Sequence, residues 1–205
     1  MRLGPSPKER RRLAFKAATG ATRALRLAAK REQNVSGEQV LVSELEAFPR
    51  RIAVAAAGLG EFELRRQPAA GEFSILENVA HLRDLEIEGT SVRIRRVLSE
   101  SNPTLSNFDG AAVAAASTYN DEDFADALTA FTLARRRNVL RLRSLVEAGF
   151  ARPATFGSRI LTLAAILEML RAHDAEHGEA IEAIASRLRG QIEELPKRDR
   201  SPSLV

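Results

Sequence analysis

Residues 71–84 read GEFSILENVAHLRD, and they predict the beginning of a long amphipathic helix. Ser74 and Glu77 have the Ser-x-x-Glu spacing of a capping box, in which two side chains satisfy backbone N–H groups at a helix N-terminus. Apolar side chains then recur on one side of the projected helix, at Ile75, Val79, Leu82, Val92 and Val97. We therefore expect a helix from about Ile75 to Ser99.

Two more stretches, one on each side of this helix, have apolar residues at helical intervals. The earlier one places them at Leu41, Leu45, Phe48, Ile52, Ala55 and Leu59. Pro49 lies inside that stripe, which predicts either a kink or a true helix start near Phe48. The later stretch is expected to begin near Thr162 and to end at Gly190, with apolar residues at Leu163, Leu167, Leu170, Ile181, Ile184 and Leu188.

The remaining helix is expected to begin near Asn120 or Asp121 and to end at Gly149. Its apolar residues are Phe124, Leu128, Phe131, Leu142 and Leu145. The run Arg135-Arg136-Arg137 in this helix is expected to be a solvated face, as most runs of like charge are.

The connections between these helices indicate the topology. The loops at 60–74 and 148–161 are of moderate length, whereas the segment 100–119, with Pro103 and Gly110, is long enough to travel the length of a bundle. Such a crossover allows helices two and three to lie parallel. Because no alternating strand pattern is present, we expect an all-α fold, a four-helix bundle with one long crossover connection between helices two and three.

Composition excludes several classes of protein. The 205 residues include no Cys and no Trp, and no apolar run approaches the roughly 20 residues that a membrane-spanning helix needs. These facts exclude a transmembrane helix, a disulfide scaffold and a zinc site built on thiolates. With 44% hydrophobic and 28% charged residues, the chain is typical of a globular protein with one substantial core.

The positive charge is concentrated at the N-terminus. Residues 1–35 contain ten Lys or Arg against Glu9 and Glu32, whereas residues 36–205 have a net charge of −4. This basic arm is compatible with nucleic acid, with an anionic membrane surface, with a targeting segment, or with a solvated tail or a mis-called start. We expect residues 36–190 to form the bundle, with flexible segments at 1–35 and 191–205, and nucleic acid binding would rest wholly on the arm.

The chemistry of the chain is expected at its three histidines, His81, His173 and His177. The last two are four residues apart, so a helix places them on adjacent turns, inside its apolar sector or at the edge of it. Buried imidazoles need partners, and one metal ion would satisfy both. The alternative is a pair of core histidines bonded to carboxylates such as Asp174, Glu176 or Glu77.

His81 bears on this choice because of its depth in the second helix. It lies about 9 Å along the helix from Ile75, at 1.5 Å per residue. If helices two and four are antiparallel, His81 lies beside the middle or the C-terminal half of helix four. A site of three histidines is then geometrically allowed.

Three motifs together resemble the DinB-like four-helix bundles. They are the stretch 71–84, the segment Asn102-Pro103-Thr104-Leu105 with Phe108-Asp109, and Ala172-His173-Asp174-Ala175-Glu176-His177, and the resemblance covers about residues 38–188. It implies a bacterial, cytoplasmic bundle in which His81, His173 and His177 bind one divalent metal. The family includes S-transferases and isomerases that use mycothiol, bacillithiol or glutathione, and many members without a known reaction.

The resemblance also concerns residues around the histidines. Asp84 and Asp174 match the family pattern and would accept hydrogen bonds from imidazole N–H groups, although pairing with Arg83, Arg171 or water is the simpler interpretation. Phe73 replaces the usual Trp, which should leave the packing intact. Ala180 replaces a frequent Gln, which bears on activity more than on metal binding.

Three histidines around Zn²⁺, Ni²⁺, Mn²⁺ or Fe²⁺ leave coordination positions open, as catalytic sites require. The expected function is therefore a metal-dependent enzyme acting on a small molecule: a hydrolase, or a thiol S-transferase or isomerase whose low-molecular-weight thiol comes from outside, since the chain has no Cys. Glu77 and Asp174 are only weak general-base candidates, so no catalytic residue is assigned. The alternative is a non-catalytic or stress-related bundle with a structural metal and a small ligand, and bundles of this kind often form homodimers.

Overall fold

The computed structural model describes residues 36–194. The basic arm expected at 1–35 and the last part of the expected tail, 195–205, lie outside the described residues. The chain divides into two units after Val40, and the arrangement below concerns residues 41–194. The helices and strands are α2 (Gly37–Ala56), α3 (Glu61–Arg65), α4 (Ile75–Asp84), the π-helical segment η1 (Leu85–Thr90), α5 (Ser91–Ser99), β1 (Thr104–Leu105), α6 (Gly110–Ala116), the 3₁₀ turn η2 (Tyr119–Asp121), α7 (Phe124–Arg143), α8 (Glu147–Phe150), β2 (Pro153–Phe156), β3 (Arg159–Thr162) and α9 (Leu163–Glu194).

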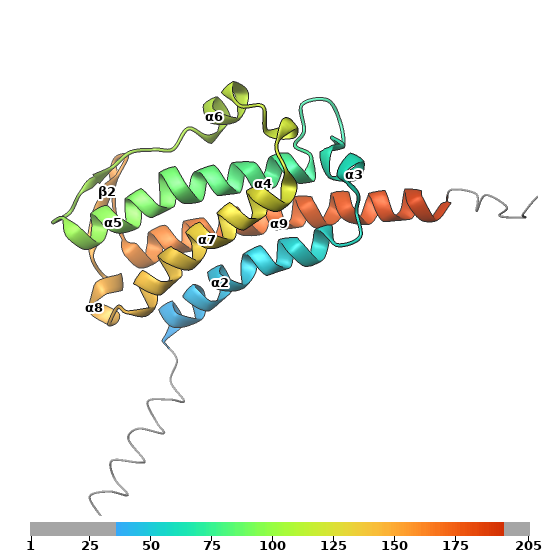
Figure 1. Ribbon diagram of the computed structural model, residues 1–205. Helices are drawn as coiled ribbons and strands as arrows, with labels where there is room; N and C mark the ends of the chain where they lie inside the picture. The colour runs from blue at the N-terminus through green and yellow to red at the C-terminus, as the bar shows by residue number, and fades with distance from the viewer. Residues whose placement is uncertain (1–35, 195–205) are drawn as a thin grey trace, which may run out of the picture. The chain divides into compact units, whose positions relative to one another are not determined.

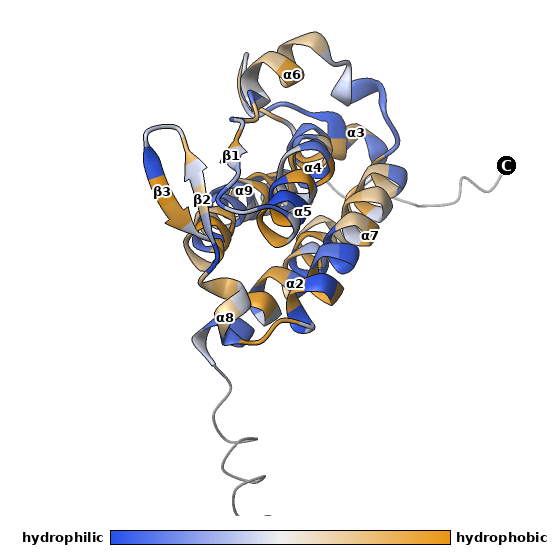
Figure 2. Ribbon diagram, turned by 90° about the vertical axis from the view of Figure 1, so that its left-hand side faces the viewer, coloured by the Kyte–Doolittle hydropathy of each residue, from blue (hydrophilic) through white to orange (hydrophobic). Residues whose placement is uncertain are grey.

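The expected four-helix bundle with one crossover is confirmed. In Figure 1, α4 and α5 follow one another along a single path that is parallel to α7 and antiparallel to α2 and α9. The crossover between α5 and α7 contains β1, α6 and η2, and α6 lies over α4 in both ribbon views (Figures 1 and 2). No helix in the described part of the chain is both long enough and apolar enough to cross a membrane.

The second helical stretch begins where the sequence predicts. Ser74 Oγ accepts a hydrogen bond from the backbone N–H of Glu77 at 3.1 Å, and the Glu77 carboxylate accepts one from the Ser74 N–H at 2.7 Å. The helical path continues to Ser99, but it includes the π-helical segment, which the sequence did not predict. There Ser91 Oγ donates to the carbonyl of Glu86, five residues earlier, at 2.8 Å.

Pro49 neither kinks α2 strongly enough to divide it nor marks its start, because α2 extends from Gly37 to Ala56. A proline within a helix has no N–H for the carbonyl four residues earlier, which here is Leu45. That carbonyl instead accepts a hydrogen bond from Arg135 Nη1 of α7 at 3.0 Å. The partner for the Leu45 carbonyl therefore comes from another helix, and α2 continues through the proline.

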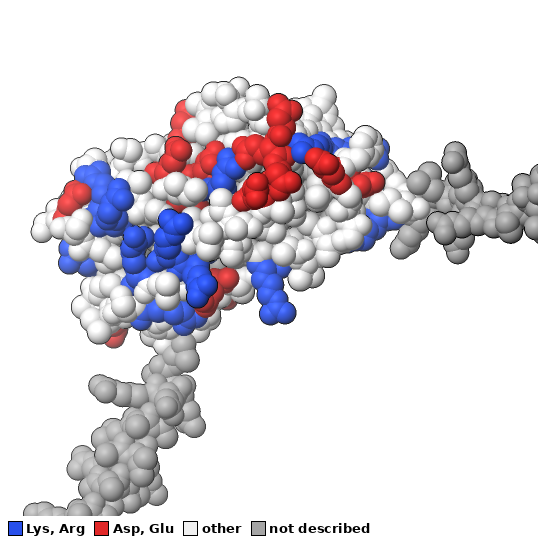
Figure 3. Space-filling view, viewed as in Figure 1, with Lys and Arg blue, Asp and Glu red and all other residues white. Residues whose placement is uncertain are grey.

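The third helix corrects two expectations. α7 ends at Arg143, and a turn and the short α8 follow, so the helix does not continue to Gly149. The turn allows Phe150 to pack in the core, where only 2% of its surface is exposed. Arg136 and Arg137 are exposed as expected, but Arg135 is buried. Figure 3 shows basic side chains gathered over α5 and α7, and all of these are Arg, because residues 36–194 contain no Lys.

A small three-stranded sheet lies outside the helical pattern. β1 pairs with β2 in parallel, and β2 pairs with β3 as an antiparallel hairpin. Gly157, at a φ of +61°, forms the turn between β2 and β3. The sequence did not predict these strands, because two to four residues are too few for alternation to be distinguished from chance.

The last helix begins as predicted but passes through Gly190 and ends at Glu194. Residues 191–194 are therefore helical and do not belong to the expected tail. A single glycine costs a helix only about 1 kcal/mol relative to alanine, which does not by itself end a helix of this length.

Gly190 offers a stability test within α9. It is exposed and a Cβ there would meet nothing within 4 Å, so Gly190→Ala is expected to raise the free energy of unfolding by about 0.5–1 kcal/mol. Gly178 of the same helix is buried, and a Cβ there would lie 2.9 Å from the ring of Phe48. Gly178→Ala should therefore be destabilising. Urea denaturation of both variants measures this, and equal effects would contradict it.

The buried residues of the bundle helices are mostly apolar, and Figure 2 shows hydrophobic segments on each of these helices. Within residues 41–194 the buried apolar residues form two clusters, one around Leu45, Val139 and Leu167 and the other around Ile52, Val79 and Ile181. A third group of buried side chains is polar. It comprises Arg135 of α7, Glu86 of the π-helical segment, Asp174 of α9 and Asn138 of α7.

Candidate metal centre

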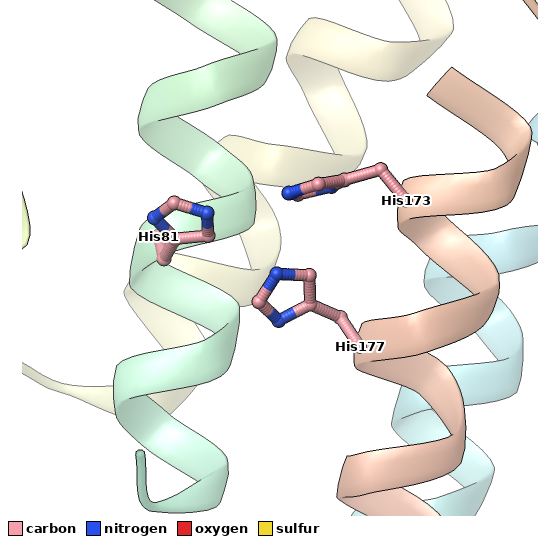
Figure 4. A group of neighbouring side chains, drawn as sticks. All are labelled: His81, His173 and His177. Carbon is pink, nitrogen blue, oxygen red and sulfur yellow. The ribbon is translucent and has the colours of Figure 1, made fainter. Parts of the chain in front are cut away.

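The three histidines predicted from the sequence converge in the structure. His81 projects from α4, and His173 and His177 project from the facing side of α9 (Figure 4). Each offers one ring nitrogen, and these atoms lie within 4.8 Å of one another. The ring centroids are 4.4 Å apart for His173 and His177, 4.9 Å for His81 and His177, and 5.5 Å for His81 and His173. The antiparallel arrangement of the two helices thus brings His81 to the depth of the other two.

Asn78 fixes the orientation of His177. Its amide nitrogen donates to the carbonyl of Ser74 at 2.8 Å, so its Oδ1 is directed to Nδ1 of His177 at 2.7 Å. Because an amide oxygen only accepts, His177 must carry its proton on Nδ1. The Nε2 atom then retains a free lone pair, which is the form of imidazole that binds a metal. Sequence reasoning missed Asn78, although it lies one helical turn before His81.

The other two histidines contain buried nitrogens without partners. Nδ1 of His81 and Nδ1 of His173 are each shielded from solvent and have no hydrogen-bond partner among the described residues. Burial is the largest cause that lowers the pKa of each, and the charge of the neighbouring His173 adds to it for His81. For His177, burial and the other two imidazoles lower the pKa to about 3. All three rings are therefore neutral at pH 7.

His81 is packed between the ring of Phe73 and the backbone at Gly110. The ring of Phe73, at the position where a Trp is usual, lies 5.7 Å from the His81 ring between centroids. On the crossover, a Cβ at Gly110 would lie 2.5 Å from Cε1 of His81, so only glycine allows this approach. The crossover therefore covers the imidazole, and only 8% of His81 is exposed.

Two cavities meet the histidines. One, of about 240 Å³, is lined by His81 and His173 together with residues of α5, α6, β2 and α9. The other, of about 560 Å³, is lined by His177, Phe73 and Ala180 among others. Ala180 thus lies beside the histidines, where a longer side chain would occupy the second cavity.

The expected contacts of Asp84 and Asp174 with the imidazoles are absent. The Asp84 carboxylate accepts from Arg83 Nε and from the Tyr119 hydroxyl, each at 2.8 Å. Arg83 was the simpler partner named for it, and the nearby carboxylate opposes the lowering of the His81 pKa without a hydrogen bond. Asp174 is only about 60° around α9 from His177, because three residues at roughly 100° each make 300°, but its carboxylate is directed to α7. It forms an ion pair with Arg135, not with Arg171.

Glu77 does not face the histidines either. Its carboxylate is used by the capping box and by Gln67, whose amide donates to it at 2.9 Å. No general base is therefore found among Glu77 and Asp174. The three imidazoles and Asn78 form the polar centre of the site.

Arg135 of α7 is the centre of a buried ion cluster that also contains Glu86 and Asp174. Its Nη1 donates to Asp174 at 2.6 Å and its Nη2 lies 3.1 Å from Glu86. The amide nitrogen of Asn138 donates to Glu86 at 2.7 Å. Arg135 also donates to the Leu45 carbonyl, so it links α7 to α2, to the π-helical segment and to α9. Its partner on α9, Asp174, is the residue that follows His173.

The comparisons with known proteins concern the family and the fold. The profile of a family described as the DinB superfamily matches residues 44–181. A solved structure of YfiT from Bacillus subtilis, described as a probable metal-dependent hydrolase with an unusual four-helix bundle topology, is similar with a TM-score of 0.68. The similarity has 22% sequence identity and covers 76% of this chain and 90% of that one, and it shows the fold. A search of curated proteins found no match.

Proposed function

The chain belongs to the DinB superfamily, and on this basis we propose that it is a metal-dependent enzyme acting on a small molecule. His81, His173 and His177 would hold one divalent metal. The observation that carries the proposal is the convergence of three neutral imidazoles from two helices, two of them with buried and unpartnered ring nitrogens.

The residues present fit a metal of the zinc or nickel type. Neutral imidazole is a preferred ligand of such ions, and no proton has to be displaced from these rings at pH 7. Buried nitrogens without partners are costly, at about 1–3 kcal/mol each, and a metal bound at those nitrogens would remove that cost. When bound, a divalent ion supplies an electrophile that activates water or a thiol.

The residues of the chain contribute orientation and exclusion of water. Asn78 holds the proton of His177 at Nδ1 and thereby keeps Nε2 available. Phe73 and Gly110 pack against His81 and shield it from solvent. The first candidate reaction is hydrolysis of a small substrate that enters one of the two cavities, and YfiT, which has the same fold, is described as a probable metal-dependent hydrolase.

A thiol S-transferase is the second candidate. Two cavities, of about 240 and 560 Å³, reach the histidines through different side chains, so two reactants have separate approaches. Since the chain has no Cys, the thiol would be a small external molecule. Turnover that requires an added thiol distinguishes this reaction from hydrolysis.

The test begins with the chelator-treated full chain. Isothermal titration with Zn²⁺ and with Ni²⁺ should give about one ion per chain. The loaded protein is then assayed on a panel of esters and amides, and on electrophiles with and without a low-molecular-weight thiol. Metal binding without any turnover would favour the non-catalytic alternative, a bundle with a structural metal. No binding of either ion would overturn the proposal.

Asn78 provides a sharper test of the same site. Asn78→Leu removes the acceptor for His177 at nearly constant volume, and it should weaken metal binding by about 10- to 100-fold. Ser74→Ala is the matched control, because it removes the cap of α4 but no contact with an imidazole. Competition with a chromogenic chelator measures both variants. An equal loss in both would show that Asn78 acts only through the stability of α4.

A further inference from the structure

Arg93 of α5 lines the same cavity as His81 and His173. It is the one charged side chain in the described lining, which contains neither Asp nor Glu. Most of the lining is apolar, and it includes Phe108, Phe156, Ile166, Leu167, Met169 and Leu170. A single cation therefore faces an apolar space whose other polar groups are the two imidazoles and the side chains of Thr90 and Asn107.

The positive charge of the Arg93 guanidinium has few partners among the described residues. Its carbon lies 5.0 Å from the ring centroid of Phe156, and Nη2 donates to the carbonyl of Ser106 at the long distance of 3.4 Å. Its Nε is buried without a hydrogen-bond partner among the described residues. Burial lowers the pKa of Arg93, and no carboxylate opposes that effect.

Other arginines of the described chain behave differently. Seven of them form ion pairs with carboxylates: Arg51, Arg65, Arg83, Arg96, Arg135, Arg143 and Arg171. Arg93 is half-buried yet has no carboxylate within 4 Å in residues 36–194. A cation partly removed from water without a counter-charge is costly, and an anion from outside the chain would offset that cost.

We propose that Arg93 binds the carboxylate of a small apolar carboxylic acid, whose hydrocarbon body fills this cavity and whose far end reaches His81 and His173. A guanidinium recognises a carboxylate through two parallel hydrogen bonds, and stacking on Phe156 holds its plane in place. Cavities of about 150 Å³ hold benzene, so about 240 Å³ accommodates a ring with a carboxylate. A small apolar carboxylic acid is then the substrate class of the proposed enzyme. Only the contact of its far end with the histidines rests on the proposed function.

The experiment compares benzoate with benzyl alcohol, which has the same ring but no charge. Binding of each to the full chain is measured by calorimetry, after chelator treatment and again with Zn²⁺. Arg93→Gln should weaken benzoate binding by about 10- to 100-fold, the range for losing a charge-assisted hydrogen bond, and leave benzyl alcohol unchanged. Arg95→Gln, the same change at an exposed position two residues later, should alter benzoate binding less than about twofold.

Three outcomes would overturn the inference. They are wild-type protein that does not bind benzoate, Arg93→Gln protein that binds it as tightly as wild type, and an equal loss for benzoate and benzyl alcohol. Because the first arm uses metal-free protein, failure of metal binding leaves this test intact. Conversely, a chain that binds Zn²⁺ but shows no dependence on Arg93 would retain the proposed metal site and lose the proposed substrate class.

Discussion

Replacing His173 with alanine is expected to reduce the metal content of the purified protein from about one ion per chain to about a tenth or less. Two histidines cannot complete a site that depends on three, and the variant keeps only His81 and His177. Elemental analysis of untagged protein, wild type beside variant, measures this. Arg171→Ala on the exposed side of α9 is the control and should retain the ion.

Thermal unfolding gives an independent readout of the same site. An ion that binds only the folded chain stabilises it by about 2.7 kcal/mol at a free concentration one hundred times its dissociation constant. Zn²⁺ should therefore raise the Tm of wild type and not that of His173→Ala. If neither protein responds and wild type contains no metal after incubation with Zn²⁺ or Ni²⁺, the histidines are core residues without a metal.

Replacing Arg135 with methionine is expected to lower the free energy of unfolding by about 3–5 kcal/mol. The change removes the donors to Asp174, Glu86 and the Leu45 carbonyl while leaving all three acceptors buried. This is a large part of the roughly 5–15 kcal/mol that stabilises a typical domain. Chemical denaturation with urea measures the loss.

Arg136→Met is the matched control, because the next residue of α7 is exposed. It should change stability by less than about 0.5 kcal/mol.

The loss in Arg135→Met should also depend on pH. Burial already raises the pKa of Glu86, and a carboxyl with a raised folded-state pKa adds stability below its unfolded pKa that is lost as pH rises. The variant should thus be relatively more stable at pH 5 than at pH 8, and the absence of any difference between the two arginines would contradict the cluster.

Local signals in the sequence predicted much of the bundle. The capping box at Ser74 and the apolar stripes depend on residues within one or two turns of each other, so they are readable without the fold. The long crossover was readable because its length exceeds that of a turn. The helix ends predicted at Gly149 and Gly190 were wrong. A helix ends where tertiary packing turns the chain, as in the turn after Arg143 that lets Phe150 pack in the core, and not at each glycine.

In the candidate site too, local spacing was readable from the sequence and contacts between distant elements were not. The histidine spacing placed two imidazoles on one face. The depth of His81 along its helix only allowed it to join them, and the set of three was implied by the resemblance to DinB-like bundles. The roles of Asn78, Arg93 and Arg135 were not readable, because each depends on atoms from distant elements. Arg135 illustrates the difficulty, since a run of three arginines gives no sign that one of them is buried.

The π-helical segment at Leu85–Thr90 determines which residue shares a face with His81. In an uninterrupted α-helix, Arg93 would lie about 120° around the axis from His81, at roughly 100° per residue. A π-helical turn absorbs about one extra residue, which reduces that angle to about 20° and brings Arg93 to the cavity that His81 lines. Gain or loss of one residue in this segment changes the phase of α5 relative to α4. A single insertion or deletion there would therefore exchange the group that meets a ligand while the side of the bundle that bears the histidines stays the same.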